Sequence, residues 1–477
     1  MTRLAADFEQ HDGLGLAELI RTKELTPDEV LAATLDRIAV RNPVVNAVVT
    51  RMDDHARAAI RAGLPDGPFR GVPYLLKDLG ALYTGTITSF GSRLYAGYTA
   101  DHDSEIVARM KRAGLVIVGK SNTPEMGIAP STEPRLFGPT RNPWKLDHSA
   151  GGSSGGAAAA VAAGMLPMAH ATDGGGSIRI PASACGLFGL KPTRARNPAG
   201  PDAGEGWSGA SIAHAVTWSV RDSAALLDAT AGPDVGDPYW APPPERPFLQ
   251  EVGREPGRLR VALNVTPWMP GPVDPECAQA ARDAARLCES LGHHVEEARP
   301  QIDEAAWGLA RRIIIVASLT FALETRAAAL GRTLSQDDVE RITWERLQEA
   351  LLFSAADYAR AIHTVHRTGR AVARFLEGYD VLLTPTMARP PQPLGVLSLS
   401  NPDSEAFNAA GTAAVGFTAL FNSSGHPAMS VPLAMSQSGL PLGVQFAARF
   451  GDEATLFRLA AQLEAAQPWR DRRPRLP

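Results

Sequence analysis

The stretch of this sequence that points most directly to chemistry is DGGGSIRIP, residues 173–181. Three consecutive glycines are entropically costly to order, which indicates a need for bare backbone. A turn of this kind can direct several N–H groups at one developing negative charge and form an oxyanion hole. Ser177 is the predicted nucleophile, and the predicted oxyanion hole consists of the N–H groups of Gly174, Gly175, Gly176 and Ser177.

A serine hydroxyl attacks a carbonyl effectively only when a base removes its proton, and Lys77 is the predicted base. It lies in GVPYLLKDL, residues 71–79, among apolar residues that would exclude water. Burial lowers the pKa of an amine, and a base at neutral pH needs a pKa of about 7–8, roughly 3 units below that of a solvated lysine. Taken alone, such a lysine more often extends from a strand end toward water.

Two other interpretations of the glycine-rich stretches are weaker. A phosphate-binding loop would need a lysine after its last glycine, and none follows Gly156 or Gly176. The stretch AGGSSGG, residues 150–156, matches the GxSxG nucleophile elbow. An elbow follows a strand, whereas the preceding TRNPWKLDHSA is polar and predicts a loop. GHPAMS around His426 is also a poor source of the required histidine.

The bulk properties describe an ordinary globular chain of 477 residues with a net charge of −4, which excludes a strongly basic nucleic-acid binder. The apolar run 313–323 is too short to span a bilayer and predicts a buried helix. The N-terminal MTRLAADFEQHDG lacks the apolar stretch of a signal peptide, so we expect a cytoplasmic protein without membrane partners. Cys185, Cys277 and Cys288 form no disulfide or zinc pattern and are expected in the core.

The alternation of helical and strand patterns predicts an α/β fold, a large mixed central β-sheet surrounded by helices. Helices are expected at 26–40, 53–62, 103–114, 154–165, 222–231, 275–292, 303–330, 335–377 and 452–465, and strands at 71–79, 115–119, 258–264, 380–384, 428–433 and 442–447. The small-residue helix at 154–165 requires a closely packed neighbour. The proline-rich stretch 233–247 predicts a surface crossing or an internal linker.

These motifs together resemble the amidase signature family over most of the chain. The resemblance runs through GVPYLLKDL, VGKSNTPEMG (118–127), TRNPWKLDHSAGGSSGG (140–156), ATDGGGSIRIPASACGLFGLKPT (171–193) and FNSSGHPAMSVPL…GLPLGVQ (421–445). It implies one domain over 1–477, with N-terminal helices at 1–66, a catalytic core at 67–232, a helical insertion at 300–377 that caps the site, and the rest of the core at 378–477.

The family's catalytic triad consists of a lysine, a serine after a cis peptide bond, and a nucleophilic serine 24 residues further on. Ser153 lies 24 residues before Ser177, which selects Ser153 rather than Ser154 as the bridging serine. The resemblance therefore implies that Lys77 draws a proton from Ser153 while Ser153 draws one from Ser177. Ser177 then carries the acyl group, and Ser153 returns a proton to the leaving amine. No metal or cofactor is implied.

The resemblance also gives roles to residues around the triad. Asp173 and Arg179 are expected to stabilise the loop of the nucleophile. Ser154 is expected to contact the catalytic residues without touching the substrate. His170 and Thr172 are expected only to pack.

Within the family, the motifs most resemble hydrolases that open cyclic 6-aminohexanoate dimers and similar broad amidases. This implies a fairly hydrophobic linear or cyclic amide, while aryl-acylamide and carbamate hydrolysis stay open because they use the same acyl chemistry. Substrate contacts are expected from Met126, Gly127 and Trp207, besides the insertion. A small-molecule amide is the expected partner, and a homodimer is left open.

Two further classes share this fold. The amidase subunit of tRNA amidotransferases usually carries SIRQPA and KPTYG, where this sequence has SIRIPA and KPTRA (191–195). A non-catalytic binding protein would lose residues of the triad, and Lys77, Ser153 and Ser177 are all present. Both alternatives are therefore weaker than an amide hydrolase.

Overall fold

The computed structural model describes residues 8–477, built around an eleven-stranded mixed sheet in the order β1-β3-β2-β6-β8-β7-β12-β13-β11-β9-β10. Its strands are β1 (Val48–Arg51), β2 (Pro73–Lys77), β3 (Val116–Ser121), β6 (Met168–Asp173), β7 (Phe188–Lys191), β8 (Ile212–Thr217), β9 (Arg260–Leu263), β10 (His294–Glu297), β11 (Val381–Pro385), β12 (Ala428–Met435) and β13 (Pro441–Ala448). A separate two-stranded sheet pairs β4 (Arg141–Asn142) with β5 (Lys145–Ser149). The predicted α/β fold with a large mixed sheet is confirmed.

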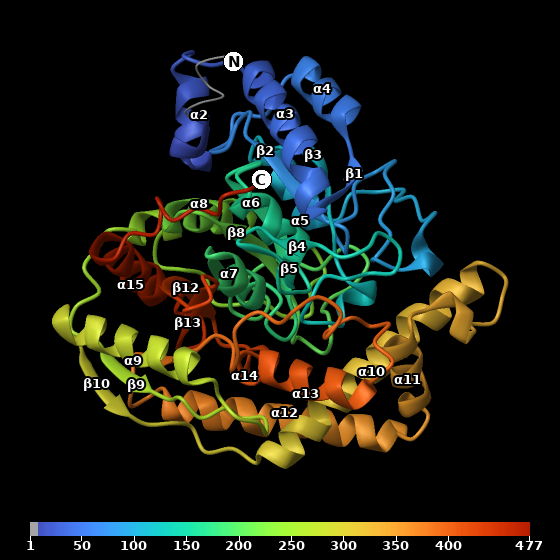
Figure 1. Cartoon of the computed structure of the whole chain (residues 1–477), viewed down its shortest axis with the longest axis vertical. Helices are drawn as coiled ribbons and strands as arrows, with labels where there is room; N and C mark the ends of the chain where they lie inside the picture. The colour runs from blue at the N-terminus through green and yellow to red at the C-terminus, as the bar shows by residue number, and fades with distance from the viewer. Residues whose placement is uncertain (1–7) are drawn as a thin grey trace.

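Helices lie around this sheet (Figure 1). They are α2 (Gly13–Arg21), α3 (Pro27–Val45), α4 (Asp53–Ala62), α5 (Glu105–Arg112), α6 (Gly155–Ala162), α7 (Arg179–Cys185), α8 (Val220–Thr230), α9 (Pro275–Ser290), α10 (Glu304–Ala329), α11 (Arg341–Ala350), α12 (Ala355–Phe375), α13 (Ser404–Val415), α14 (Ala419–Ser424) and α15 (Glu453–Ala466). In Figure 1, α2, α3 and α4 lie together at the top of the view, whereas α10, α11 and α12 lie at the bottom, beside α13 and α14.

The strands that position the site are β2 and β6, which are parallel neighbours inside the sheet. The carboxyl ends of parallel strands meet at the same edge of a sheet. The last residue of β2 is Lys77 and the last residue of β6 is Asp173, so the predicted base and the glycine-rich stretch emerge side by side.

The small-residue helix α6 has the close neighbour that its composition predicted. All of its residues are buried. A Cβ atom added at Gly156 would lie 2.4 Å from the backbone nitrogen of Asn122, so only glycine lets the two backbones approach this closely. The three cysteines are likewise free and buried, as predicted.

The prediction of one helix over 335–377 is wrong. The structure has a short 3-10 turn at Gln336–Asp338, then α11, then α12. The break before α12 is fixed by a capping box, in which the Ser354 side chain accepts from the Asp357 N–H and the Asp357 side chain accepts from the Ser354 N–H.

Several elements were missed because their patterns are short or lack alternation. Inner strands buried on both faces show no polar–apolar period, which hid β6 and β7. The edge strand β10 is mostly exposed and polar, and the short helices α7 and α14 are buried throughout. The loop predicted at 140–150 is partly wrong, since it contains the β4–β5 hairpin. The crossing at 233–247 holds no helix or strand, as expected.

Helix α10 is longer than the predicted apolar run. The helix predicted over 303–330 is confirmed by α10, which at 26 residues is, by length and composition alone, apolar enough to cross a membrane. Core helices of globular proteins pass the same test. Here α10 packs along α12 and α11, and Ile313, Leu319 and Leu323 are buried.

Candidate active site

Lys77 is fully buried, and its amine contacts two hydroxyl groups. Its Nζ lies 2.7 Å from Oγ of Ser153 and 2.9 Å from Oγ1 of Thr172. Burial lowers the pKa of Lys77 to about 7, and the charge of Asp173 only partly opposes that shift. Near neutral pH a large share of the amine is therefore uncharged, with a lone pair that can accept the proton of Ser153.

Thr172 was expected only to pack, and that prediction is wrong. Its hydroxyl accepts a hydrogen bond from the Lys77 amine, which also contacts Ser153. The main chain of Thr172 is held in turn by Ser154, whose hydroxyl donates to the Thr172 carbonyl and accepts from its N–H, both at 3.3 Å. Ser154 thus supports the lysine through Thr172.

His170 also touches Lys77, through the backbone. The N–H of Lys77 donates to Nδ1 of His170 at 3.2 Å, so Nδ1 carries the lone pair and Nε2 the hydrogen. Burial lowers the pKa of His170 to about 3, and the charge of Lys77 acts in the same direction. The ring is therefore a neutral support for the end of β2 rather than a second base.

Ser153 sits in a turn that leaves no room for side chains. The structure has the expected cis peptide bond between Gly152 and Ser153. A Cβ atom on Gly152 would lie 2.2 Å from the carbonyl oxygen of Ser131, and one on Gly127 would lie 3.3 Å from Oγ of Ser153. The glycines around Ser153 are thus explained by close approach. The nucleophile-elbow interpretation does not fit, because the Ser153 hydroxyl contacts a lysine and no histidine.

The glycine turn before Ser177 differs from prediction in one residue. The N–H of Gly176 donates to the Asp173 carboxylate at 2.7 Å, so it points away from a substrate carbonyl. Gly176 has φ +133°, a conformation that favours glycine and turns this amide inward. The N–H groups of Gly174, Gly175 and Ser177 pair with no acceptor in residues 8–477, so the oxyanion hole predicted with four donors is reduced to three.

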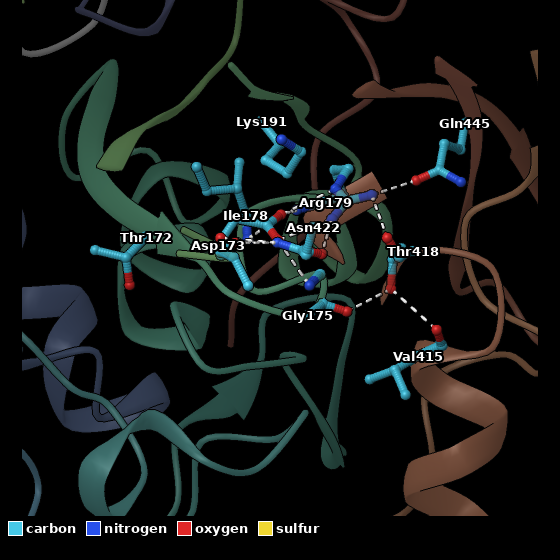
Figure 2. Close-up of polar contacts among 12 residues, drawn as sticks. Thr172, Asp173, Gly175, Ile178, Arg179, Lys191, Val415, Thr418, Asn422 and Gln445 are labelled. Carbon is cyan, nitrogen blue, oxygen red and sulfur yellow. Dashed lines mark hydrogen bonds and ion pairs between the residues drawn. The ribbon is translucent and has the colours of Figure 1, made fainter. Parts of the chain in front are cut away.

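The Asp173 carboxylate holds the turn from inside the protein (Figure 2). Besides the N–H of Gly176, it accepts from the N–H of Ile178 and, at 2.8 and 2.9 Å, from the guanidinium of Arg179. Both side chains are completely buried. Burial alone would raise the pKa of Asp173, but the Arg179 charge and these hydrogen bonds hold it well below its usual value. The pair therefore stays charged and fixes the loop of Ser177.

Three residues in this network were not singled out from the sequence. Asn422 donates to Asp173 and accepts from Arg179, whereas Gln445 accepts from Arg179 at 2.6 Å. Thr418 donates to the carbonyl of Gly175 at 2.6 Å, and its own carbonyl accepts from Arg179 (Figure 2). Asn422 lies in the quoted stretch FNSSGHPAMSVPL, so a signal for it was present. Gln445 ends the stretch GLPLGVQ that also carries the resemblance, so a signal was present for it too, whereas Thr418 lies outside these stretches.

Comparisons with known proteins identify the family of this chain. The sequence matches the family described as amidase over residues 29–457, well over half of the chain. The chain belongs to the amidase signature family. It is similar to the 6-aminohexanoate-cyclic-dimer hydrolase of Paenarthrobacter ureafaciens, with 42% identity over 98% of this chain and 96% of that protein. The acylamidase of Rhodococcus erythropolis is 35% identical over 96% of each chain.

The fold of this chain is also similar to that of a solved structure. The structure of 6-aminohexanoate cyclic dimer hydrolase complexed with substrate has a TM-score of 0.93 and 41% identity, over 98% of this chain and 99% of that one. This amidase is thus a hydrolase that acts on carbon–nitrogen bonds of amides. Across residues 8–477, no group of three or more His, Cys, Asp and Glu side chains is arranged to hold a metal ion.

The three predicted substrate contacts of this amidase lie in different surroundings. Gly127 faces the hydroxyl of Ser153. Met126 packs at the edge of an apolar cluster that includes Leu319 and Leu347 of the helical insertion. The indole of Trp207 lies against Gly174, where an added Cβ atom would be 2.8 Å from the ring. The roles of all three toward substrate remain predictions.

Proposed function

We propose that this amidase hydrolyses fairly hydrophobic linear or cyclic amides, such as 6-aminohexanoate oligomers, through an acyl-enzyme on Ser177. The observation that carries this proposal is the buried Lys77 amine, hydrogen-bonded to Ser153 with a pKa near neutral. The similarity to 6-aminohexanoate-cyclic-dimer hydrolases supports the substrate class.

The proposed reaction has two halves. Neutral Lys77 takes the proton of Ser153 while Ser153 takes that of Ser177, and the Ser177 oxygen attacks the amide carbon. The N–H groups of Gly174, Gly175 and Ser177 hold the oxyanion. The C–N bond then breaks as Ser153 delivers a proton to the leaving amine. Water, deprotonated through the same hydroxyl and lysine, releases the acid from Ser177.

Aryl-acylamide or carbamate hydrolysis is the second candidate, favoured by the 35% identity to an acylamidase. Amine release should be measured from linear and cyclic 6-aminohexanoate dimers, a 4-nitroanilide, an aryl carbamate, a short fatty primary amide and glutamine. Ser177→Ala serves as the matched control. Turnover of one class that disappears in the variant identifies the substrate class. If the folded enzyme releases no amine from any of them, the proposed function is wrong.

A further inference from the structure

A narrow cavity adjoins the glycine turn on the side of the helical insertion. From the core it is lined by Gly174 and Trp207. From α10 and α12 it is lined by Arg311, Ile314 and Val365. The cavity thus joins the predicted oxyanion hole to an apolar wall that contains one cation.

Arg311 has no acidic partner in this position. Its Nη2 contacts only Sδ of Met269, at 4.0 Å, and its Nε is buried without a hydrogen-bond partner. No carboxylate of residues 8–477 forms an ion pair with it. Glu349 pairs instead with two other arginines, Arg312 and Arg346.

The surroundings of Arg311 therefore disfavour its charge. Burial, together with the charges of Arg346 and Arg312, lowers the pKa of Arg311 to about 10. The side chain still carries its proton at neutral pH. Arg311 is partly buried, and a cation withdrawn from water without a countercharge is costly unless a ligand supplies the countercharge.

We propose that Arg311 binds a carboxylate at the far end of the substrate, so that the preferred substrate is an aliphatic amide whose chain ends in a carboxylate. A guanidinium fork suits a carboxylate in two parallel hydrogen bonds. Ile314, Val365 and Trp207 provide the apolar wall that a methylene chain requires. This inference rests on the proposed function. It predicts that linear 6-aminohexanoate oligomers, which end in a carboxylate, are preferred over the cyclic dimer, which has none.

The test uses matched acids and methyl esters. One pair places the charge on the acyl side, adipic acid mono-4-nitroanilide and its methyl ester. The other places it on the amine side, N-acetyl-6-aminohexanoate and its methyl ester. We expect kcat/KM for the acid of one pair to exceed that for its ester by at least about tenfold. A hydrogen bond to a charged group stabilises a complex by about this factor. Arg311→Met should remove that preference.

Controls separate the subsite from the catalytic machinery. Arg312→Met removes a neighbouring, half-exposed cation and should keep the preference. Arg311→Glu should disfavour the acid. Adipate should raise the melting temperature of the wild type but not of Arg311→Met, a readout independent of turnover.

Two results would contradict different claims. If the esters are hydrolysed and neither acid is preferred, or if the preference survives in Arg311→Met, the carboxylate subsite is wrong while the proposed function stands. If the wild type hydrolyses neither acid nor ester of any pair, nor any amide of the first panel, the proposed function itself fails.

Discussion

The two sides of the candidate site are built in opposite ways. On the sheet side, Lys77, Asp173 and Arg179 are completely buried, and Asp173 and Arg179 share a dense network of hydrogen bonds. On the helical side, Arg311 has no countercharge, and α10 and the turn after α11 leave Phe321 and Leu352 more than 70% exposed. From this difference we propose that the bond-breaking chemistry depends on the buried strand ends, and that the helices of residues 300–377 select the substrate.

This contrast assigns different effects to substitutions on the two sides. Those on the sheet side should reduce turnover of every amide. Those on the helical side should change only which amides are preferred.

The largest effect is expected for Lys77→Met, which keeps the bulk of the side chain but removes the base. Because proton transfer from Ser153 and Ser177 depends on this amine, kcat/KM should fall by at least about a thousandfold for every substrate that the wild type accepts. Steady-state rates on an acid and its ester check this. A loss confined to one of the two substrates would place Lys77 in substrate selection instead.

Asp173→Asn should lower the free energy of unfolding without changing which substrates are preferred. The substitution leaves the buried Arg179 guanidinium without a countercharge, a change that costs about 3–5 kcal/mol. Denaturant unfolding of the wild type and the variant measures the difference. As a matched control, Asp283→Asn removes one partner of an exposed pair with Arg286 and should change stability by less than about 1 kcal/mol. Equal losses in both variants would contradict the role given to the buried network.

The pH dependence of kcat/KM should follow the protonation of Lys77. Only uncharged Lys77 can accept a proton, and its pKa is about 7, so the protonated fraction grows as the pH falls below that value. The rate kcat/KM should therefore drop about tenfold per pH unit below pH 7 and level off above it. A profile that stays flat from pH 5 to 9 would show that Lys77 does not act as the base.

The family resemblance, through the spacing of the two serines, and the apolar run around Lys77 selected the three residues on which the proposed mechanism depends. The structure brings two of them, Lys77 and Ser153, into hydrogen-bond contact. The roles of Thr172 and Gly176 were misjudged, since each depends on the direction of one side chain or one amide across neighbouring strands and turns. Arg311 gave no signal at all. A cation on a predicted helix looks the same in the sequence whether or not an acid lies opposite it.

The smallest effect on turnover is expected for Thr172, which contacts the base Lys77 but is not itself the base. Thr172→Val keeps the shape of the side chain but removes the hydroxyl that accepts from Lys77. Losing one hydrogen bond of this kind should lower kcat about tenfold, with little change in KM. A hydrogen bond stabilises the charged amine more than the neutral one, so its loss should also move the acid limb of the pH profile to lower pH. Thr172→Ser, which restores a hydroxyl, should recover the position of the limb. If Thr172→Val lowers kcat without moving the limb, the hydrogen bond from Lys77 to Thr172 does not set the pKa of the base.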